Sequence, residues 1–459
     1  MAKNSIRDFS ATAASNTDIQ SVDIDENCAA SGINNAIREL MADLADVNAG
    51  TVAMTSPSAD SLSTDTISEK TSGSGVTIDS VLLKDGALGS IASAVAAHLT
   101  SINGGQIGGN RNLIINGAFE VAQRATSKAH TESAINGYYT VDRFQLLSNA
   151  MDQLRVTQTQ STTSPDGFSN SFGVEVTVAE SALAADEILY IQYRAEAQDL
   201  QHLAYGTSDA KKVTLSFYVR SSLTGKYTVL LYQDDATRSN TQSITINSAN
   251  TWERKTITFD GDTSGTINND NGYGLLMNVV LAAGTDFAGT PHTGWGTYNQ
   301  TDDFAHGDQV NFAAQTGTFF ITGIQLEVGS TATEFEHRSY GDELRRCQRY
   351  YYKLKPGSTA SGYASCNSNN TSRSDAICHF PVTMRSIPTA VETTGVASDY
   401  GSLTAGVNVN CNSVPTFVRA SLNTSFVRFP YASGSVTTGQ AGVIQAKHAD
   451  SFLAWSAEL

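Results

Sequence analysis

The sequence predicts a mainly β protein, with short helical and shaft segments at the N-terminus, a central β-sandwich of the jelly-roll type and a small C-terminal β-domain. Ser, Thr, Asn and Gly are common while Leu and Lys are sparse, a composition that favours strands and turns over helices. From residue 111 onward, strand-like runs follow one another without helical spacing between them. Successive strands without intervening helices are typical of a sandwich or jelly roll.

Composition limits the kinds of partner. The 459 residues carry a formal net charge of −16, which argues against general nucleic-acid binding because phosphate neutralisation needs clustered Lys and Arg. Residues 339–459 hold ten Lys and Arg against seven Asp and Glu, so the preceding residues carry all of the acidic excess. We therefore expect the two ends of the protein to face different partners.

Targeting segments and disulfides are not expected. The first ten residues are polar and the longest apolar stretch, near residues 274–283, is too short to span a bilayer, so we expect synthesis in a cytoplasm, no signal-peptide export and no membrane insertion. The cysteines are odd in number and form no CxxC pair, which predicts reduced thiols. They are Cys28, Cys347, Cys366, Cys378 and Cys411.

Residues 31–48 form the clearest predicted helix, with Ser31 as its N-cap. Its apolar residues follow heptad spacing, and two heptads are too few for a stable isolated coiled coil. The stripe is therefore expected to pack against copies of itself or against another protein, and a helix packed on its own domain stays open as an alternative. The stripe consists of Ile33, Ile37, Leu40, Leu44 and Val47.

Residues 50–80 are rich in Ser, Thr, Gly and Asp, which is typical of a linker or an extended shaft. A strand-like piece at residues 75–86 is followed by an amphipathic stretch from Ala87 to Ile102. Segments this thin cannot bury themselves within one chain, so several chains are expected to wind together.

The β-region begins at Asn112–Arg124, which is predicted as a first strand interrupted at Asn116 and Gly117. Residues 211–222 alternate apolar and polar side chains, as a half-buried antiparallel strand does. Residues 339–354 carry Leu344, Cys347, Tyr351 and Leu354 at helical spacing and are predicted as a helix that connects to the C-terminal β-domain, whose last strand is the C-terminus.

Several segments also carry a resemblance to a known family. They are "IRDFSATAASNTDI", "GINNAIRELMADL", "GVTIDSVLLKDG", "NLIINGAFEVAQR", "YYTVDRF" and "ITGIQLEVGSTATEFEHRSYGDELRRCQRYY". In this order, from near residue 6 to residue 352 and more weakly to the final "SAEL", they resemble tail fibre and tail-tip proteins of bacteriophages, particularly podovirus-like marine ones. No single segment is diagnostic, whereas their order is fairly specific.

The resemblance implies a homotrimeric structural protein of the virion tail that recognises and adsorbs to the host cell. Residues 1–50 would attach to a tail adaptor, a nozzle or another virion protein, and residues 51–110 would form a trimerising shaft. Residues 111–338 would form a carbohydrate-binding jelly roll, and residues 339–459 a tip. The ligand would be a host surface polysaccharide or lipopolysaccharide.

Calcium is the one cofactor that the resemblance suggests. In jelly rolls of this type, the first strand pairs with the last and its Glu often helps to hold a structural calcium, which points to Glu120 with Glu327 as a neighbour. Calcium needs six or more oxygen ligands. The alternative is that Asn116 and Gly117 form a β-bulge and Glu120 is solvated.

Two regions supply candidate glycan-binding residues. The polar, glycine-rich segment 290–308 offers aromatic rings for stacking and polar groups for hydroxyls, with Trp295 packed under its own loop as the alternative. The mildly basic C-terminal region would suit an anionic lipopolysaccharide. The candidates are Trp295, Tyr298, Gln300, Asp302, Asp303, Arg373, Arg419 and Arg428.

No catalytic residue is predicted. The sequence contains no GxSxG, no phosphate-binding loop and no His pair beside a Glu, so the protein is not expected to be an enzyme. Two alternatives stay open: a tail-associated polysaccharide depolymerase, although the repeats of a β-helix are not visible, and a ligand-free structural fibre of the tail or capsid.

Overall fold

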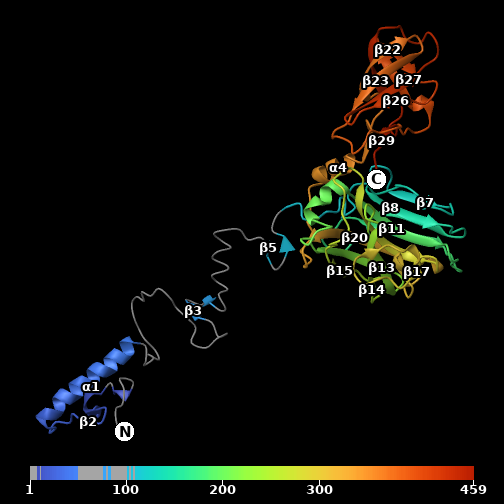
Figure 1. Ribbon diagram of the computed structural model, residues 1–459. Helices are drawn as coiled ribbons and strands as arrows, with labels where there is room; N and C mark the ends of the chain where they lie inside the picture. Colours follow the sequence, from blue (N-terminus) through green and yellow to red (C-terminus); the bar gives the residue numbers. More distant parts are fainter. Residues whose placement is uncertain are drawn as a thin grey trace. The chain divides into compact units, whose positions relative to one another are not determined.

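The computed structural model describes residues 8–10, 12–49, 76–78, 81–83, 101–102, 105–106 and 109–459. The chain divides into two compact units, residues 1–97 and residues 98–459 (Figure 1). The described part of the predicted shaft consists of two strand pairs, β3 (Val76–Ile78) with β4 (Val81–Leu83) and β5 (Ser101–Ile102) with β6 (Gly105–Gln106). The remaining shaft predictions, including the amphipathic stretch from Ala87, lie outside the described residues.

The first unit contains the predicted helix. Helix α1 (Ala30–Asn48) follows the short 3-10 turn η2 (Ala13–Ser15) and the hairpin of β1 (Asp18–Ile19) and β2 (Val22–Asp23). The prediction of Ser31 as N-cap is wrong, because the helix begins one residue earlier, after Ala29, with no side-chain cap. No helix in the described part of the chain is long and apolar enough to cross a membrane.

The apolar stripe of α1 is not the face that packs within this unit. The buried residues of the helix are Ala36 and Asp43, and the Asp43 carboxylate accepts a hydrogen bond of 2.8 Å from Gln20 beside the hairpin. Ile33, Ile37 and Leu44 are half exposed, and Leu40 and Val47 are partly buried. Among the described residues of this unit, the heptad stripe therefore remains available to a partner.

The second unit contains the predicted β-sandwich, built from two six-stranded antiparallel sheets (Figure 1). The order of the first sheet is β15-β12-β20-β10-β9-β7, and that of the second is β18-β14-β13-β16-β11-β8. The bounds are β7 Ser127–His130, β8 Phe144–Asn149, β9 Arg155–Ser161, β10 Ser171–Val178, β11 Ile188–Glu196, β12 Val213–Ser221, β13 Gly225–Gln233, β14 Arg238–Ile246, β15 Glu253–Phe259, β16 Tyr273–Ala283, β18 Gly296–Thr297 and β20 Gly317–Val328. The mainly β fold class is confirmed.

Alternating side chains explain why these segments pair. In β12, Val213, Leu215, Phe217 and Val219 are all fully buried between the sheets, as their period-two spacing predicts. Short elements lie between the strands: η3 (Ala197–Leu203), β17 (Ala288–Gly289), α3 (Gln300–Asp303), β19 (Ala305–His306) and η4 (Phe312–Ala314).

The prediction of a strand at Asn112–Arg124 is wrong. The segment has no regular strand because Asn116 and Phe119 adopt positive φ angles of 63° and 56°. It nevertheless runs against β20, the last strand of the sandwich, through Leu113 N–H to Leu326 O at 2.9 Å and Ile324 N–H to Gly117 O at 3.0 Å. The alternative of a β-bulge at Asn116 and Gly117 is also not what forms, since no ladder surrounds them.

The connecting helix is shorter than predicted. Helix α4 (Tyr340–Gln348) begins after Ser339, whose side chain caps the Asp342 N–H, and Tyr351 and Leu354 belong instead to strand β21 (Tyr351–Leu354). Tyr351 and Leu354 form a strand because β21 pairs with β29 (Leu453–Ser456). A strand in the closing segment is thereby confirmed, and it ends three residues before the C-terminus.

The C-terminal region forms a seven-stranded antiparallel sheet with the order β25-β24-β28-β22-β23-β27-β26. One face carries a core of its own that includes Tyr400, Phe429 and Trp455, all fully buried. The bounds are β22 Gly362–Asn370, β23 Arg373–His379, η5 Ala397–Asp399, β24 Tyr400–Thr404, β25 Val407–Asn410, β26 Thr416–Ala420, β27 Thr424–Pro430 and β28 Ala441–Ala446.

Buried ion pairs join this sheet region to the sandwich. Arg143 is fully buried, stacks 3.5 Å from the ring centroid of Tyr350 and pairs with Glu458 next to the C-terminal strand. Glu196, at the end of β11, accepts hydrogen bonds of 2.6 Å from Arg349 and 2.7 Å from the Tyr350 hydroxyl. Truncating one partner of such a pair would leave a buried charge without compensation.

The close approach of Gly117 to β20 predicts a large cost for a side chain there. A Cβ atom on Gly117 would lie 2.1 Å from the carbonyl oxygen of Ile324, so the Gly117→Ala variant should lose about 3 kcal/mol of unfolding free energy in urea. The matched control is Gly341→Ala in α4, where no atom lies within 4 Å of the new Cβ, and its stability should be unchanged or slightly higher. Equal destabilisation of the two variants would contradict this account.

Candidate functional site

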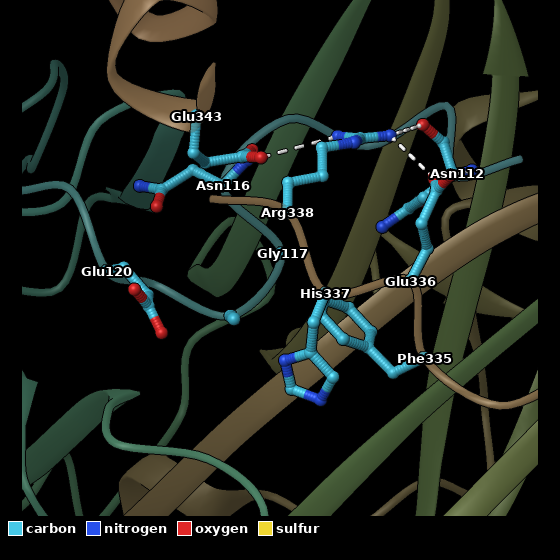
Figure 2. A pocket seen from close by; sticks show the side chains of 10 residues that line it. Asn112, Asn116, Gly117, Glu120, Phe335, Glu336, His337, Arg338 and Glu343 are labelled. Atoms are coloured by element: carbon cyan, nitrogen blue, oxygen red, sulfur yellow. Dashed lines mark hydrogen bonds and ion pairs between the residues drawn. The ribbon is translucent and has the colours of Figure 1, made fainter. Parts of the chain in front are cut away.

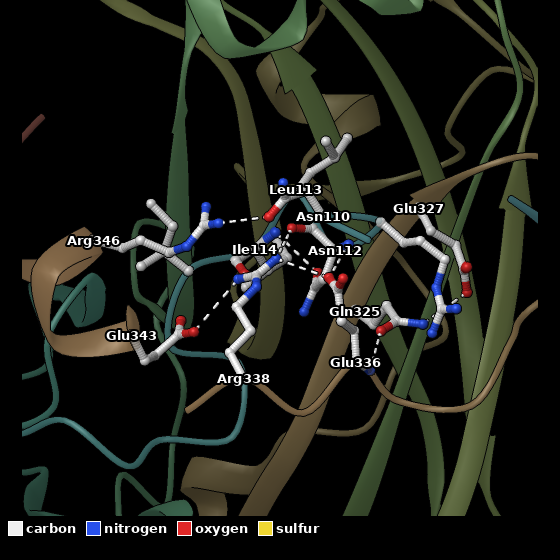
Figure 3. A network of polar contacts seen from close by, with 12 residues as sticks. Asn110, Asn112, Leu113, Ile114, Gln325, Glu327, Glu336, Arg338, Glu343 and Arg346 are labelled. Carbon is white, nitrogen blue, oxygen red and sulfur yellow. Dashed lines mark hydrogen bonds and ion pairs between the residues drawn. The ribbon is translucent and has the colours of Figure 1, made fainter. Parts of the chain in front are cut away.

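Arg338 lies at the centre of a polar network that holds the segment before the sandwich (Figure 3). Its guanidinium donates to the carbonyl oxygens of Ile114 (3.2 Å) and Asn112, and it pairs with Glu336 (3.1 Å) and Glu343 (3.5 Å). The two carboxylates also accept the backbone N–H groups of Asn112 and Asn116. The network therefore connects residues 112–117 to the segment that follows β20, through Glu336 and Arg338, and to helix α4, through Glu343.

Electrostatics in this network favour the ionised form of Glu336. Burial alone would raise the pKa of this carboxyl, but the Asn112 N–H and the Arg338 charge outweigh it and hold the pKa below its usual range. Side-chain hydrogen bonds of Asn112 complete the network, since its amide donates to Ile324 O (3.0 Å) and its oxygen accepts from Leu326 N–H (3.1 Å). All these hydrogen bonds hold residues 112–117 in place.

The pocket beside the network is too small for a ligand. It is lined by Asn112, Gly117, Glu120, His337 and Glu343 among others (Figure 2) and has a volume of about 20 Å³. A volume of this size holds about one water molecule. The Asn-Gly interruption therefore serves close backbone packing.

The predicted calcium ligands have different surroundings. Glu327 is fully buried, and its carboxylate accepts hydrogen bonds from Thr333 N–H (2.8 Å), Thr333 Oγ1 (2.7 Å) and Gln325 Nε2 (2.9 Å). Glu120 is half buried and lines the small pocket. Calcium at Glu120 and Glu327 stays a prediction.

A different acidic group is brought together by the fold. Carboxylate oxygens of Asp152, Glu180 and Glu187 lie within 4.8 Å of one another, and this is the group of three that could hold a metal ion within the described residues. Glu180 and Glu187 are buried. Burial, with the charges of Glu180 and Asp152, raises the pKa of the Glu187 carboxyl. Spacing along the sequence gave no signal for this group.

Trp295 and Tyr298 lie in the segment between β16 and β20, and both are half buried. The Trp295 indole N–H donates to Asp260 O at 2.6 Å, and its ring packs edge-on to Tyr205 at 5.7 Å. Tyr298 packs 5.0 Å from Tyr232 in a cluster on the second sheet. Trp295 therefore packs against residues outside the segment 290–308, which differs from the alternative of a ring under its own loop, and Tyr298 also packs against another strand.

The acidic candidates of the same segment serve its folding. Asp303 is buried and accepts the N–H groups of Asn299 (2.7 Å) and His292 (3.2 Å), while its backbone oxygen accepts from Thr241. Asp302 accepts from the Asn299 amide at 2.7 Å. Gln300 is exposed at the start of α3. Residues 290–308 are thus held against the sandwich by these contacts, and the predicted glycan-binding side chains of this segment do not come together at one place.

Three predicted arginines do converge, on the outer face of the C-terminal sheet, which is the face opposite the Trp455 core. Arg373 is on β23, Arg428 on the neighbouring β27, and Arg419 on β26 beyond it. Strand register places Arg428 directly opposite Asp375 of β23, with Nε 3.1 Å from the Asp375 Oδ1. The Arg419 guanidinium lies 4.4 Å from the ring centroid of Phe426.

These arginines contact Asp375 and Phe426, which line an open groove of about 420 Å³, here called the C-terminal groove. Residues from β22 supply hydroxyl and amide groups, β23 supplies a carboxylate, an imidazole and an apolar side chain, and β27 supplies an aromatic ring. Most of its lining side chains are polar, and apolar surface comes from Ile377 and Phe426. Its side chains are Ser365, Asn367, Asn369, Asp375, Ile377, His379 and Phe426.

Most of the groove residues were missed in the sequence. The signal was present, because β22 and β23 alternate polar outer residues with buried ones at positions 365–369 and 373–379. What could not be predicted was the neighbour relation between β23 and β27, since the two strands are separated by more than forty residues.

No family model and no curated protein matches this chain. Solved structures with partial similarity include the enzymatically active domain of bacteriophage CBA120 tailspike protein 4, at 11% identity over 48% of this chain and 21% of that one, with a TM-score of 0.26. A family 11 carbohydrate-binding module from Clostridium thermocellum, in complex with a mixed-linked tetrasaccharide, has 13% identity over 46% and 99% of the two chains and a TM-score of 0.23. TmCBM61 in complex with β-1,4-galactotriose has 9% identity over 48% and 99%, with a TM-score of 0.23.

The acidic group predicts a stabilising substitution. In chelator-containing buffer, Glu187→Gln should raise the thermal unfolding midpoint at pH 7, because it removes a buried charge that repels Glu180 and Asp152. A carboxyl with a raised folded-state pKa costs stability above that pKa, so the advantage of the variant should disappear as the pH falls toward 4. Glu175→Gln at an exposed position of β10 is the control and should change neither value. A lower midpoint for Glu187→Gln at pH 7 would contradict the repulsion.

Proposed function

We propose that this protein is a bacteriophage tail fibre that adsorbs to the host by binding a surface glycan in the C-terminal groove. The observation that carries the proposal is the convergence of amide, carboxylate, guanidinium and aromatic side chains on one uncovered sheet face. The sequence resemblance to tail fibres supports the biological setting, and the groove supports the chemistry.

The chemistry of the groove suits a sugar. Asn367 and Asn369 present planar amide groups that pair with hydroxyls, and Phe426 and Ile377 present apolar surface for the C–H face of a ring. Ile377 is 50% exposed, although it lies in the middle of a strand. Its exposed apolar surface lies beside the amides, where the C–H face of a sugar ring could contact it.

Within the second unit, the sandwich segment 290–308 is a weaker candidate for the same role. Trp295 uses its N–H and its ring in packing, and Asp303 uses both carboxylate oxygens in backbone contacts. We therefore place the glycan-binding site at the C-terminal groove and not at residues 290–308.

Trimerisation through the first unit would make weak glycan sites effective. The α1 stripe of Ile33, Ile37 and Leu44 is about half exposed, which suits packing against copies of the same helix or against a tail adaptor. Linked sites convert weak contacts into stable attachment, because the second and third bind at a high effective concentration.

A depolymerase remains the main alternative function. Glycosidases generally use two carboxyl groups on either side of the scissile bond. The lining of the groove contains one, Asp375, and this carboxylate is paired with Arg428. The appearance of new reducing ends when the full chain is incubated with host polysaccharide would show that the protein is an enzyme and would overturn a purely adhesive role.

The binding proposal predicts the effect of removing the ring. On immobilised host polysaccharide, Phe426→Ala in the full chain should weaken binding roughly tenfold, because the apolar contact with the sugar is lost. Tyr340→Ala, which removes a ring that is 54% exposed on α4, is the matched control and should bind as the native chain does. Unchanged binding by Phe426→Ala, with native folding shown by circular dichroism, would rule out the groove.

The oligomerisation proposal predicts a change in mass. The native protein should have three times the mass of the 48.7 kDa chain in light scattering, and Ile37→Asp should lower that mass because it buries a charge in the helical interface. Asn34→Asp adds the same charge at an exposed position outside the stripe and should leave the trimer intact. A native monomer would refute self-association through α1.

A further inference from the structure

We propose that the C-terminal groove selects acidic polysaccharides and binds the carboxylate of a uronic acid between Arg373 and Arg428. This inference rests on the proposed glycan-binding function and adds the class of ligand. It also assigns Asp375 as a positioning residue that orients the two guanidinium groups.

Arg428 has unused donors at the groove. It contacts Asp375 through Nε alone at 3.1 Å, and no Nη group of Arg428 donates a hydrogen bond to another residue in the described part of the chain. About one third of its side chain, 34%, is exposed. A guanidinium whose terminal nitrogens face solvent beside amides can bind a planar carboxylate through two hydrogen bonds.

Arg373 supplies the second, independent observation. Its Nε is buried and has no hydrogen-bond partner, and it lies 4.0 Å from the nearer Asp375 oxygen, beyond hydrogen-bonding distance. A buried donor without a partner is costly unless something binds it. The Arg373 side chain is 35% exposed, so an anion seated between Arg373 and Arg428 can pair with the charge of this guanidinium while Nε stays enclosed.

The local charge balance also favours an anion. The Asp375 carboxylate is shared by Arg428, Arg373 and the Asn369 amide, so one negative charge faces two positive ones. Arg419 adds a third positive charge over Phe426. A basic spot on a chain with a net charge of −16 would attract an acidic polymer to this face and away from the rest of the surface.

Asp375 fits a positioning role. It is buried, with 6% of its surface exposed, and it lies opposite Arg428 in the strand register. Its oxygens accept from Arg428 Nε and Asn369 Nδ2, which directs the remaining Arg428 nitrogens toward solvent. A carboxylate this enclosed reaches a ligand only through the side chains that it orients.

The test is direct binding of the full chain to polygalacturonate, to the same polymer with its carboxyl groups methyl-esterified, and to duplex DNA. The native protein should bind polygalacturonate at least tenfold more tightly than the ester, and raising the salt from 50 to 200 mM should weaken only the former. Arg428→Gln and Arg373→Gln should each remove roughly tenfold of the affinity for polygalacturonate while leaving that for the ester unchanged.

Further variants separate positioning from simple charge. Arg428→Lys should restore only part of the affinity, because Lys cannot form the paired hydrogen bonds. Asp375→Asn should weaken polygalacturonate binding although it makes the groove more positive, whereas a merely electrostatic role would strengthen it. Arg345→Gln is the matched control, since Arg345 is 73% exposed on α4, and it should bind like the native chain.

The outcomes distinguish the two proposals. Equal binding of the acid and the ester, with both reduced by Phe426→Ala, would overturn the acidic selectivity while glycan binding stands. Binding of neither polymer, nor of host polysaccharide, would overturn the proposed function as well. Tight binding of DNA that depends on Arg428 would refute a sugar ligand.

Discussion

The contact on which the second unit depends is the close approach of residues 112–117 to strand β20. Gly117 leaves no room for a side chain against Ile324, and Arg338 holds the same segment from the other side through carbonyl oxygens of Asn112 and Ile114. Because Glu343 joins this network from α4, the helix is fixed to the sandwich at the point where the chain leaves it. The position of β21, and of the sheet that follows, is set by that helix.

Buried charge then fixes the C-terminal sheet region. The Arg143–Glu458 pair is enclosed, and Glu196 is buried under the partly exposed Arg349. The desolvation of such charges largely offsets their attraction, so their main contribution is to select one arrangement over others. The side chains of Asn271 and Arg385 each donate a hydrogen bond to the other residue's backbone oxygen, at 2.9 Å and 2.6 Å. These contacts hold the C-terminal groove in a fixed orientation to the sandwich.

Period-two alternation was enough to predict the strands of the sandwich, as β12 shows, and helical spacing was enough to place α1. Two predictions failed for different reasons. Residues 112–124 form no regular strand because Asn116 and Phe119 have positive φ angles. Tyr351 and Leu354 belong to a strand and not to the helix because β21 pairs with β29, which is distant in the sequence. The arginines of the candidate site were predicted, but Asp375, Asn369 and Phe426 were not, because only tertiary strand order brings them together. Trp295 was predicted as a glycan-binding residue because it lies in a polar, glycine-rich segment, and its indole N–H instead donates to Asp260 O.

The several contacts between the sandwich and the C-terminal region also have a mechanical consequence. Arg124 and Arg143 both hold Glu458, while Arg349 holds Glu196 at a different strand end, so the joint is bridged at separate points and not at a single pivot. A sideways pull on the C-terminal region would be shared among these bridges, and rotation about any one of them would be resisted by the others. Stiffness against shear and torque is thus built into the joint by charges that add little to folding.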